Sequence, residues 1–146
     1  MIRIEHQERF AVPVETGFAF ITDLANWPAY WPGFVRSEPG SRWAAPGDEA
    51  RIVVELLGRE TELRLTMRRL EPNRLVEYES VQPGLPDARH ERHFTPAGSD
   101  GFDYRLAVEY EPRGGVRGIS DRLILRRGVE RALRRTTANL HAALTA

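Results

Sequence analysis

The stretch of sequence that decides the fold runs from Gly115 to Ala146 and reads GVRGISDRLILRRGVERALRRTTANLHAALTA. If each residue turns a helix by about 100°, apolar side chains gather on one stripe centred on Val129 and arginines gather on the opposite side. This pattern predicts one long amphipathic helix with a solvent-facing basic side. The stripe comprises Leu125, Val129, Ala132, Leu133, Thr136, Leu140, Ala143 and Leu144, and the basic side comprises Arg127, Arg131, Arg134 and Arg135.

Most residues before this helix alternate between apolar and polar side chains, as in strands with one buried face. The clearest run is Glu60–Leu70, where Leu63, Leu65 and Met67 alternate with charged or polar residues. Short turns rich in Pro, Gly, Asn and Asp separate successive runs, which predicts antiparallel neighbours. A curved antiparallel sheet is therefore the expected support for the long helix. The predicted strands are Ile2–Phe10, Val35–Trp43, Ala50–Leu57, Glu60–Leu70, Leu75–Val81, Arg89–Phe94 and Phe102–Tyr110.

Two short helical segments are expected between the first two strands. Pro13 ends the first strand and suits the entrance of a helix, and Phe18 and Ile21 follow at helical spacing, which predicts a helix over Val14–Leu24. The next segment, Asn26–Phe34, contains two prolines, so its aromatic residues are expected on a short turn of helix and a loop.

The overall composition describes one globular domain that spans residues 1–146. Hydrophobic residues make up 41% of the chain and charged residues 29%, a balance typical of folded rather than disordered proteins. No run of eighteen apolar residues and no secretory signal pattern occurs, so we expect a cytoplasmic protein without a membrane span. The absence of cysteine excludes disulfides, thiol catalysis and thiolate metal sites.

Charge is distributed unevenly, although the formal net charge is zero. From Pro112 onward, eight arginines accompany only Asp121 and Glu130, which leaves about +6 on this part and about −6 on the first 111 residues. A basic helix can contact nucleic acid or an anionic membrane. Because this helix carries no aromatic residues and no basic sheet accompanies it, nucleic acid is not an expected partner.

Four stretches carry a resemblance to a known family, and the resemblance extends over essentially the whole chain. They are FAVPVE at residues 10–15 leading into Phe18 and Phe20, the cluster from Asp23 to Trp27 with Trp31 and Phe34, LEPNRL at residues 70–75, and Phe94-Thr95-Pro96 followed by Gly101. With the order of strand, helix pair, six strands and long helix, the chain resembles the START-like, Bet v 1-like helix-grip superfamily, and within it the bacterial polyketide cyclase/dehydrase group. The resemblance implies an α+β helix-grip fold, with a seven-stranded antiparallel sheet curled around the C-terminal helix and a pocket for an apolar or aromatic small molecule.

The pleat of one predicted strand indicates which polar side chains could reach such a pocket. If Phe94 points inward, the two-residue period brings His90 and Arg92 inward with it. Two interpretations stay open. These side chains either reach water at an open rim, or they hydrogen-bond a ligand oxygen with Tyr78 or Tyr104 as a further phenolic donor. Both tyrosines could instead be ordinary core residues.

Aromatic and basic residues supply the remaining candidates. Trp27, Tyr30, Trp31 and Phe34 either plug one end of the sheet or form a wall that stacks on a ligand ring, and the resemblance places this region near the cavity. Arg122 and Arg126 lie near the apolar stripe at the start of the long helix, either beside an entrance or on a frayed helix end. The full set of candidate ligand-binding residues is Trp27, Tyr30, Trp31, Phe34, Leu65, Met67, Tyr78, His90, Arg92, Tyr104, Arg122 and Arg126.

Several other chemistries find no support in the sequence. His90 and His93 are three residues apart on a predicted strand and so face opposite sides, while His6 and His141 are far along the chain, which makes a metal site improbable. The chain has no Gly-x-Ser-x-Gly nucleophile elbow, and without lysine it cannot form a lysine-type phosphate loop. We therefore expect neither a metal nor a cofactor.

Three functions stay open on the sequence. The first is a module that binds a hydrophobic metabolite without chemistry. The second is an enzyme of the polyketide cyclase/aromatase kind, with Arg92 stabilising an enolate and Tyr78, His90 or Tyr104 moving a proton. The third is a protein-interaction module that uses the basic helix. Binding is slightly favoured because no catalytic set is evident, and either a monomer or a homodimer is compatible with each function.

Overall fold

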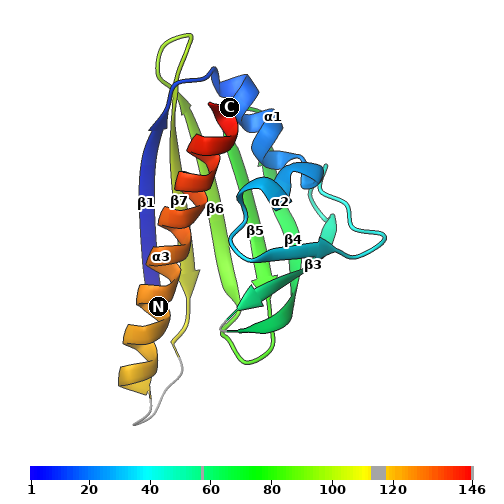
Figure 1. Ribbon diagram of the computed structural model, residues 1–146, viewed down its shortest axis with the longest axis vertical. Helices are drawn as coiled ribbons and strands as arrows, with labels where there is room; N and C mark the ends of the chain where they lie inside the picture. The colour runs from blue at the N-terminus through cyan, green and yellow to red at the C-terminus, as the bar shows by residue number, and fades with distance from the viewer. Residues whose placement is uncertain (57, 113–117, 146) are drawn as a thin grey trace.

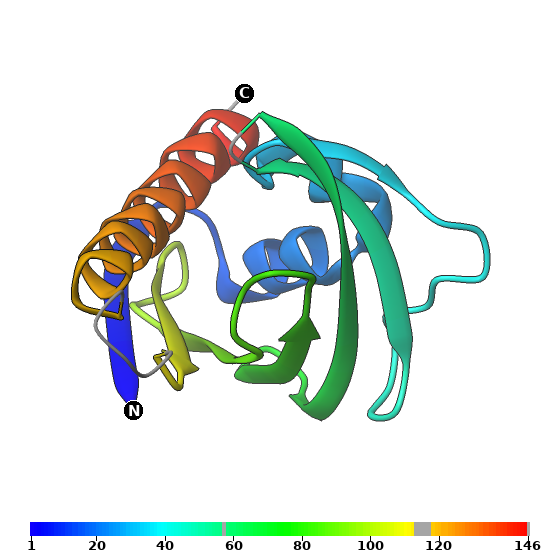
Figure 2. The ribbon, with the colours of Figure 1, turned by 90° about the horizontal axis from the view of Figure 1, so that it is seen from below.

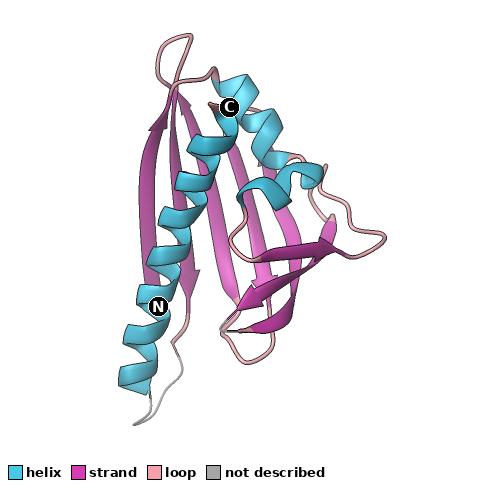
Figure 3. Ribbon diagram, viewed as in Figure 1, coloured by secondary structure: helices cyan, strands magenta, loops and turns pink. Residues whose placement is uncertain are grey.

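Seven strands and a long C-terminal helix build the molecule (Figure 1; Figure 3). The computed structural model describes residues 1–56, 58–112 and 118–145, and for residues 118–122 it describes the backbone only. The strands are β1 (Ile2–Phe10), β2 (Phe34–Ser37), β3 (Glu49–Leu56), β4 (Arg59–Glu71), β5 (Leu75–Val81), β6 (Ala88–Pro96) and β7 (Phe102–Tyr110). The helices are α1 (Val14–Thr22), the 3₁₀ helix η1 (Leu24–Asn26), α2 (Trp27–Tyr30) and α3 (Gly118–Leu144).

The strands form one antiparallel sheet in the order β1-β7-β6-β5-β4-β3-β2. Neighbours in sequence pair as hairpins from β2 to β7, and β1 closes onto β7 with Ile2 opposite Tyr110 and Phe10 opposite Phe102. This arrangement confirms the α+β fold class, the seven-stranded antiparallel sheet, the two short helices after the first strand and the long final helix.

The helices lie on the concave face of the curved sheet, with α3 along one side and α1 and α2 across one end (Figure 2). The predicted apolar stripe of α3 packs on the sheet, where Leu133 and Leu140 are buried. Hydrogen bonds join α3 to α2 on one flank and to β1 on the other. Asn139 donates from Nδ2 to the carbonyl oxygen of Tyr30 in α2 at 3.1 Å, and the Thr137 hydroxyl lies 3.1 Å from Nε2 of His6 in β1.

The strand predicted over Val35–Trp43 is wrong beyond residue 37. Pro39 has no N–H for a ladder, and Gly40 adopts a left-handed φ of 86°. The Ser41 hydroxyl accepts from the N–H of Arg51 at 3.0 Å and donates to its carbonyl at 3.2 Å, and the backbone N–H of Glu38 donates to the same carbonyl at 2.7 Å. A side chain therefore shares in the hydrogen bonding to β3 at this point, and residues 38–48 form a loop along the edge of β3.

Two helix boundaries also differ from the expected ones. The helix predicted over Val14–Leu24 ends at Thr22, because the Asp23 carboxylate accepts from the backbone N–H of Ala25 at 3.0 Å and starts the 3₁₀ turn. The final helix, expected from Gly115, is described from Gly118, and residues 115–117 and 146 lie outside the described residues. In the ranges that the structure covers, no helix is both long and apolar enough to cross a membrane.

Candidate ligand-binding site

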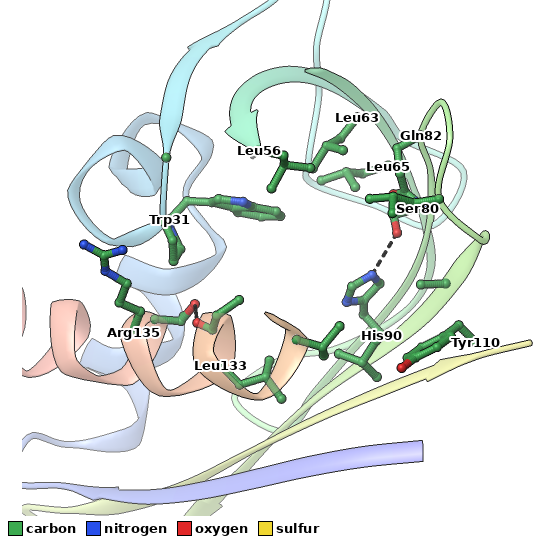
Figure 4. Close-up of a pocket in the computed structure, with 18 of the residues that line it drawn as sticks. Trp31, Leu56, Leu63, Leu65, Ser80, Gln82, His90, Tyr110, Leu133 and Arg135 are labelled. Carbon is green, nitrogen blue, oxygen red and sulfur yellow. Dashed lines mark hydrogen bonds between the residues drawn. The ribbon is translucent and has the colours of Figure 1, made fainter. Parts of the chain in front are cut away.

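A cavity of about 620 Å³ lies between the concave face of the sheet and α3. Leu56, Leu63 and Leu65 of β3 and β4 form one apolar wall, and Val129 and Leu133 of α3 form another. Figure 4 shows Leu56, Leu63 and Leu65 facing Leu133 across the opening. The amphipathic pattern of α3 thus serves two purposes, since the same stripe that packs on the sheet also lines the cavity.

The third wall is polar and is built by β5, β6 and β7. The pleat of β6 puts His90 and Arg92 on the same face as the buried Phe94, and both side chains line the cavity. On the neighbouring strands Tyr78 stands opposite His90, and Tyr110 stands opposite Ala88 one pleat further along. The inward orientation predicted for His90 and Arg92 is therefore present in the structure.

Hydrogen bonds and a ring stack hold these side chains in one arrangement. Arg92 donates from Nη2 to the Tyr78 hydroxyl at 2.8 Å, and its guanidinium carbon lies 5.7 Å from the centre of the Tyr78 ring. The rings of Tyr78 and His90 stack with their centres 4.4 Å apart and their planes at 4°. His90 Nε2 lies 2.9 Å from the Ser80 hydroxyl, the contact drawn as a dashed line in Figure 4. These contacts form a chain from Arg92 through Tyr78 and His90 to Ser80, so each side chain holds the next one in position.

The electrostatics of this wall are those of a neutral imidazole beside a cation, each half-buried as a residue, with His90 Nδ1 and Arg92 Nη1 shielded from solvent. Burial, followed by the nearby charge of Arg92, lowers the pKa of His90 to about 3, so His90 is neutral at physiological pH. Burial also lowers the pKa of Arg92, but the hydroxyls of Tyr78 and Tyr104 outweigh it, and the net pKa lies above its usual range. The wall therefore carries one positive charge.

Three buried polar atoms of this wall have no hydrogen-bond partner among the described residues. They are Nη1 of Arg92, Nδ1 of His90 and the hydroxyl of Tyr110. Burying a polar group without a partner costs free energy, so most such groups in folded proteins are paired. All three residues line the same cavity. Nη1 of Arg92 and the hydroxyl of Tyr110 can donate hydrogen bonds to oxygen atoms of a small molecule.

The aromatic cluster predicted near the cavity divides between core and lining. Trp31 lines the cavity, whereas Trp27 and Tyr30 are buried beside it. Trp27 donates its indole N–H, at 3.2 Å, and Tyr30 its hydroxyl, at 2.6 Å, to the carbonyl of Ile21 at the end of α1. Trp43 of the loop after β2 joins the cluster, with its ring centre 5.3 Å from that of Trp27.

The remaining candidates lie at various distances from the cavity wall. Leu65 lines the cavity, Met67 and Tyr104 are fully buried in the core, and Phe34 packs against the core at the start of β2. Arg126 pairs with Glu130 at 3.1 Å on the exposed side of α3. The Arg122 side chain lies outside the described residues. For all twelve candidates, contact with a ligand stays a prediction.

Arg135 differs from its predicted place on the solvated side of the final helix. It is exposed, but it also lines the cavity (Figure 4). Its position is about 120° around the helix from Val129, so it stands on the flank rather than at the back. From there the long apolar stem of an arginine can reach the rim while the charge stays in water.

Sequence reasoning missed Ser80 and Tyr110 as members of the polar wall. Both could have been found from the two-residue period of a strand, which also oriented His90. Ser80 lies on the same face of its strand as Tyr78, and Tyr110 lies on the same face as Tyr104. Trp43 could not be found in this way, since it lies in the loop that had been predicted to be a strand. Within the described ranges, no group of three or more His, Asp or Glu residues is arranged to hold a metal ion.

Comparisons with known proteins agree with this architecture. A family described as "Polyketide cyclase / dehydrase and lipid transport" matches residues 1–145. A search among curated proteins finds no significant match. Among solved structures, a START superfamily protein from Mycobacterium smegmatis has a TM-score of 0.80 and 14% identity, and the match covers 97% of this chain and 95% of that one.

Two further similar structures are described as aromatase/cyclases. The Zhui aromatase/cyclase from Streptomyces sp. R1128 has a TM-score of 0.74 and 17% identity, with 97% of this chain and 90% of that chain covered. The di-domain ARO/CYC BexL from the BE-7585A biosynthetic pathway has a TM-score of 0.80 and 19% identity, with 99% of this chain and 47% of that chain covered, so this chain spans about half of it. At such identities the likeness shows the fold alone. Because the family match extends over nearly the whole sequence, this chain belongs to the polyketide cyclase/dehydrase and lipid transport family.

Proposed function

We propose that the protein binds a hydrophobic, ring-bearing small molecule in the cavity between the sheet and α3. The observation that carries this proposal is a cavity of about 620 Å³ with apolar walls and one polar wall of hydrogen-bonding side chains. Small-molecule sites in proteins have this general composition, with a mostly apolar lining and a few fixed polar groups that orient the ligand. Polyketide-like and lipid-like molecules both match such a lining.

Trp31 supports a ligand with flat rings and also provides the test. Its indole lines the cavity, where it could stack on a ring. We expect aromatic polyketides or flavonoids to quench tryptophan fluorescence and to raise the melting temperature. A ligand at a hundred times its dissociation constant adds about 2.7 kcal/mol to the free energy of unfolding, which is several degrees for a domain of this size.

The tryptophans offer a matched pair of variants for this test. In Trp31→Phe the quenching should fall sharply, because the indole that lines the cavity is gone. In Trp43→Phe it should persist, because Trp43 contacts Tyr78 and Trp27 and does not belong to the lining found among the described residues. If flavonoids, polyketides, sterols and fatty acids all leave the melting temperature of the unmodified protein unchanged, the proposal is wrong.

An alternative function, cyclisation of a poly-ketone chain, is favoured by one observation. Arg92 and Tyr78 are hydrogen-bonded to each other on the cavity wall. In an aldol condensation the α-proton of the acidic poly-ketone would leave to water, and a cation can stabilise the enolate oxygen that results. A phenol can donate the proton that the new alkoxide oxygen takes up and regain it from water. With a pKa of about 3, His90 is too weak a base to remove a proton efficiently at neutral pH, so we assign it to positioning.

Kinetics separate this alternative from simple binding. In Arg92→Ala, cyclisation that needs the guanidinium should slow by about a hundredfold or more, as when one oxyanion donor is removed, while affinity for the poly-ketone changes much less. A binding protein would instead lose affinity and would show no turnover before or after the substitution. The measurement compares product formation with the dissociation constant for the same compound.

A further inference from the structure

Arg92 places a permanent positive charge on the polar wall of the cavity, whose other charged lining residues, Glu55 and Arg135, are exposed to solvent. The guanidinium stays protonated under all ordinary conditions. The polar groups that act on it are the hydroxyls of Tyr78, Tyr104 and Tyr30, and none of these is a carboxylate. Among the described residues no carboxylate pairs with it, although arginines on the outer face of the sheet are paired, such as Arg3 with Glu91 and Glu109.

A buried charge without a counter-ion is costly, and proteins usually pair it or place it at a functional site. The neighbours of Arg92 do not lower this cost by much. Tyr78 accepts one hydrogen bond from Nη2 at 2.8 Å, but Nη1 has no partner among the described residues. The guanidinium therefore has both an unbalanced charge and an unused donor.

From this arrangement we infer that the ligand is an apolar acid bound as its anion, with a carboxylate that pairs with Arg92. The inference rests on the proposed cavity function and specifies the chemical class of the ligand. One negative charge balances the one positive charge of the polar wall, and a carboxylate oxygen accepts the hydrogen bond that Nη1 can donate. The hydroxyl of Tyr110, also without a partner among the described residues, stands opposite Ala88, four residues along β6 from Arg92, and can donate to an oxygen elsewhere on the ligand.

The charge state of His90 makes the preference independent of pH over a wide range. Since burial keeps the pKa of His90 near 3, the wall has the same charge at pH 5 as at pH 8. An acid that is ionised throughout this range should then bind with constant affinity. A neutral ligand of the same shape would leave the Arg92 charge unpaired, and its affinity would be lower.

The test compares acids with neutral molecules of nearly the same shape. The probes are 2-naphthoic acid against 2-naphthamide, for an aromatic source of the carboxylate, and dodecanoic acid against dodecanamide, for a fatty-acid source. Calorimetric titration at pH 6 to 8 should show at least one acid binding tenfold or more tightly than its amide, with little change over the pH range. The preferred pair identifies the source.

Substitutions show whether Arg92 is responsible for the preference. In Arg92→Met the acid should fall to the affinity of the amide, and the amide should bind as before or more tightly. Arg89→Met, on the exposed outer face of the same strand, should leave the preference intact. Arg92→Gln provides a second test if Arg92→Met does not give a circular dichroism spectrum of the folded protein.

The possible outcomes are distinct. If acids and amides bind equally well, the cavity function stands and the anion proposal is overturned. If the preference survives in Arg92→Met but disappears in Arg135→Gln or in high salt, the rim arginine is responsible and the proposal is again overturned. If none of the ligands in either panel binds, the proposed function fails and this inference fails with it.

Discussion

At the scale of single residues, His90 couples the stability of the folded protein to pH. Its imidazole stacks on Tyr78 and lies beside Arg92, and burial holds its pKa near 3 against an ordinary value of 6.5. The unfolded chain therefore binds a proton at this residue at a higher pH than the folded protein does. Between pH 6.5 and pH 3, acid favours the unfolded state, so stability is lost as the pH falls through this window.

We expect His90→Gln to flatten the dependence of stability on pH between about 6.5 and 4.5. The contribution of one such group has a slope of at most about 1.4 kcal/mol per pH unit. Chemical denaturation at several pH values measures it, and His93→Gln on the outer face serves as the control because it keeps the buried imidazole. A variant with the same slope as the unmodified protein would show that His90 takes up its proton in the folded state.

A second group of residues, three carboxyls on the outer face of the sheet, affects the stability of the protein only at lower pH. Hydrogen bonds from Arg3 lower the pKa of Glu5 and of Glu91, and a hydrogen bond from Arg9 lowers the pKa of Asp103. For each carboxyl the folded pKa is below the unfolded one, so its stabilising effect is complete above the unfolded value, near 4, and disappears as the pH falls below it. These three carboxyls therefore contribute little to the pH dependence well above pH 4.5, where the His90→Gln variant is compared with the unmodified protein.

At the scale of elements, the packing of α1 depends on a glycine in its middle. Gly17 is buried, and a Cβ placed there would lie 2.3 Å from Cε1 of Phe102 in β7. Phe102 cannot move aside easily, because it is fully buried and stacks on Phe10 with ring centres 5.3 Å apart. The absence of a side chain at Gly17 therefore allows α1 to lie close against the sheet.

Gly17→Ala should destabilise the protein, although alanine is the better helix former. The overpacking penalty in a dense core is about 1 to 3 kcal/mol and exceeds the helix-propensity gain of about 1 kcal/mol. Gly128→Ala in α3 is the matched control, because its Cβ would meet nothing within 4 Å and the gain should appear alone. Urea unfolding of both variants gives the comparison, and a stable Gly17→Ala protein would contradict this account of the α1 interface.

Helices and strands were predictable from the sequence wherever one face is buried and the other is exposed to solvent. The alternation of Leu63, Leu65 and Met67 reflects the two faces of β4, and β5, β6 and β7 follow the same rule. The segment after β2 was not predictable in this way, since the Ser41 hydroxyl satisfies the backbone of Arg51 there and no periodic signal marks such a bond. A hydrogen bond between a side chain and the backbone of another segment depends on how the chain folds, so it leaves no pattern in the local sequence.

At the scale of the whole molecule, the candidate site was partly predictable for a similar reason. One buried reference residue, Phe94, was enough to orient His90 and Arg92, because a strand has only two faces. The aromatic segment before β2 is not a strand, so no buried residue in it could be used to orient the others. Trp27 and Tyr30 turn away to share the carbonyl of Ile21, and only the folded path of the chain brings that carbonyl within reach.

The pairing of β1 with β7 determines the order in which this molecule can be assembled. The partners in this ladder are separated by about a hundred residues, from Phe10 with Phe102 to Ile2 with Tyr110. The hairpins from β3 to β7 need only short loops to close, so we expect them to form early, whereas β1 can pair only after the meander has formed. Because α3 also packs against β1, we expect the first strand and the final helix to dock together as the last event. We therefore expect the slowest step in folding to be the one that encloses the cavity.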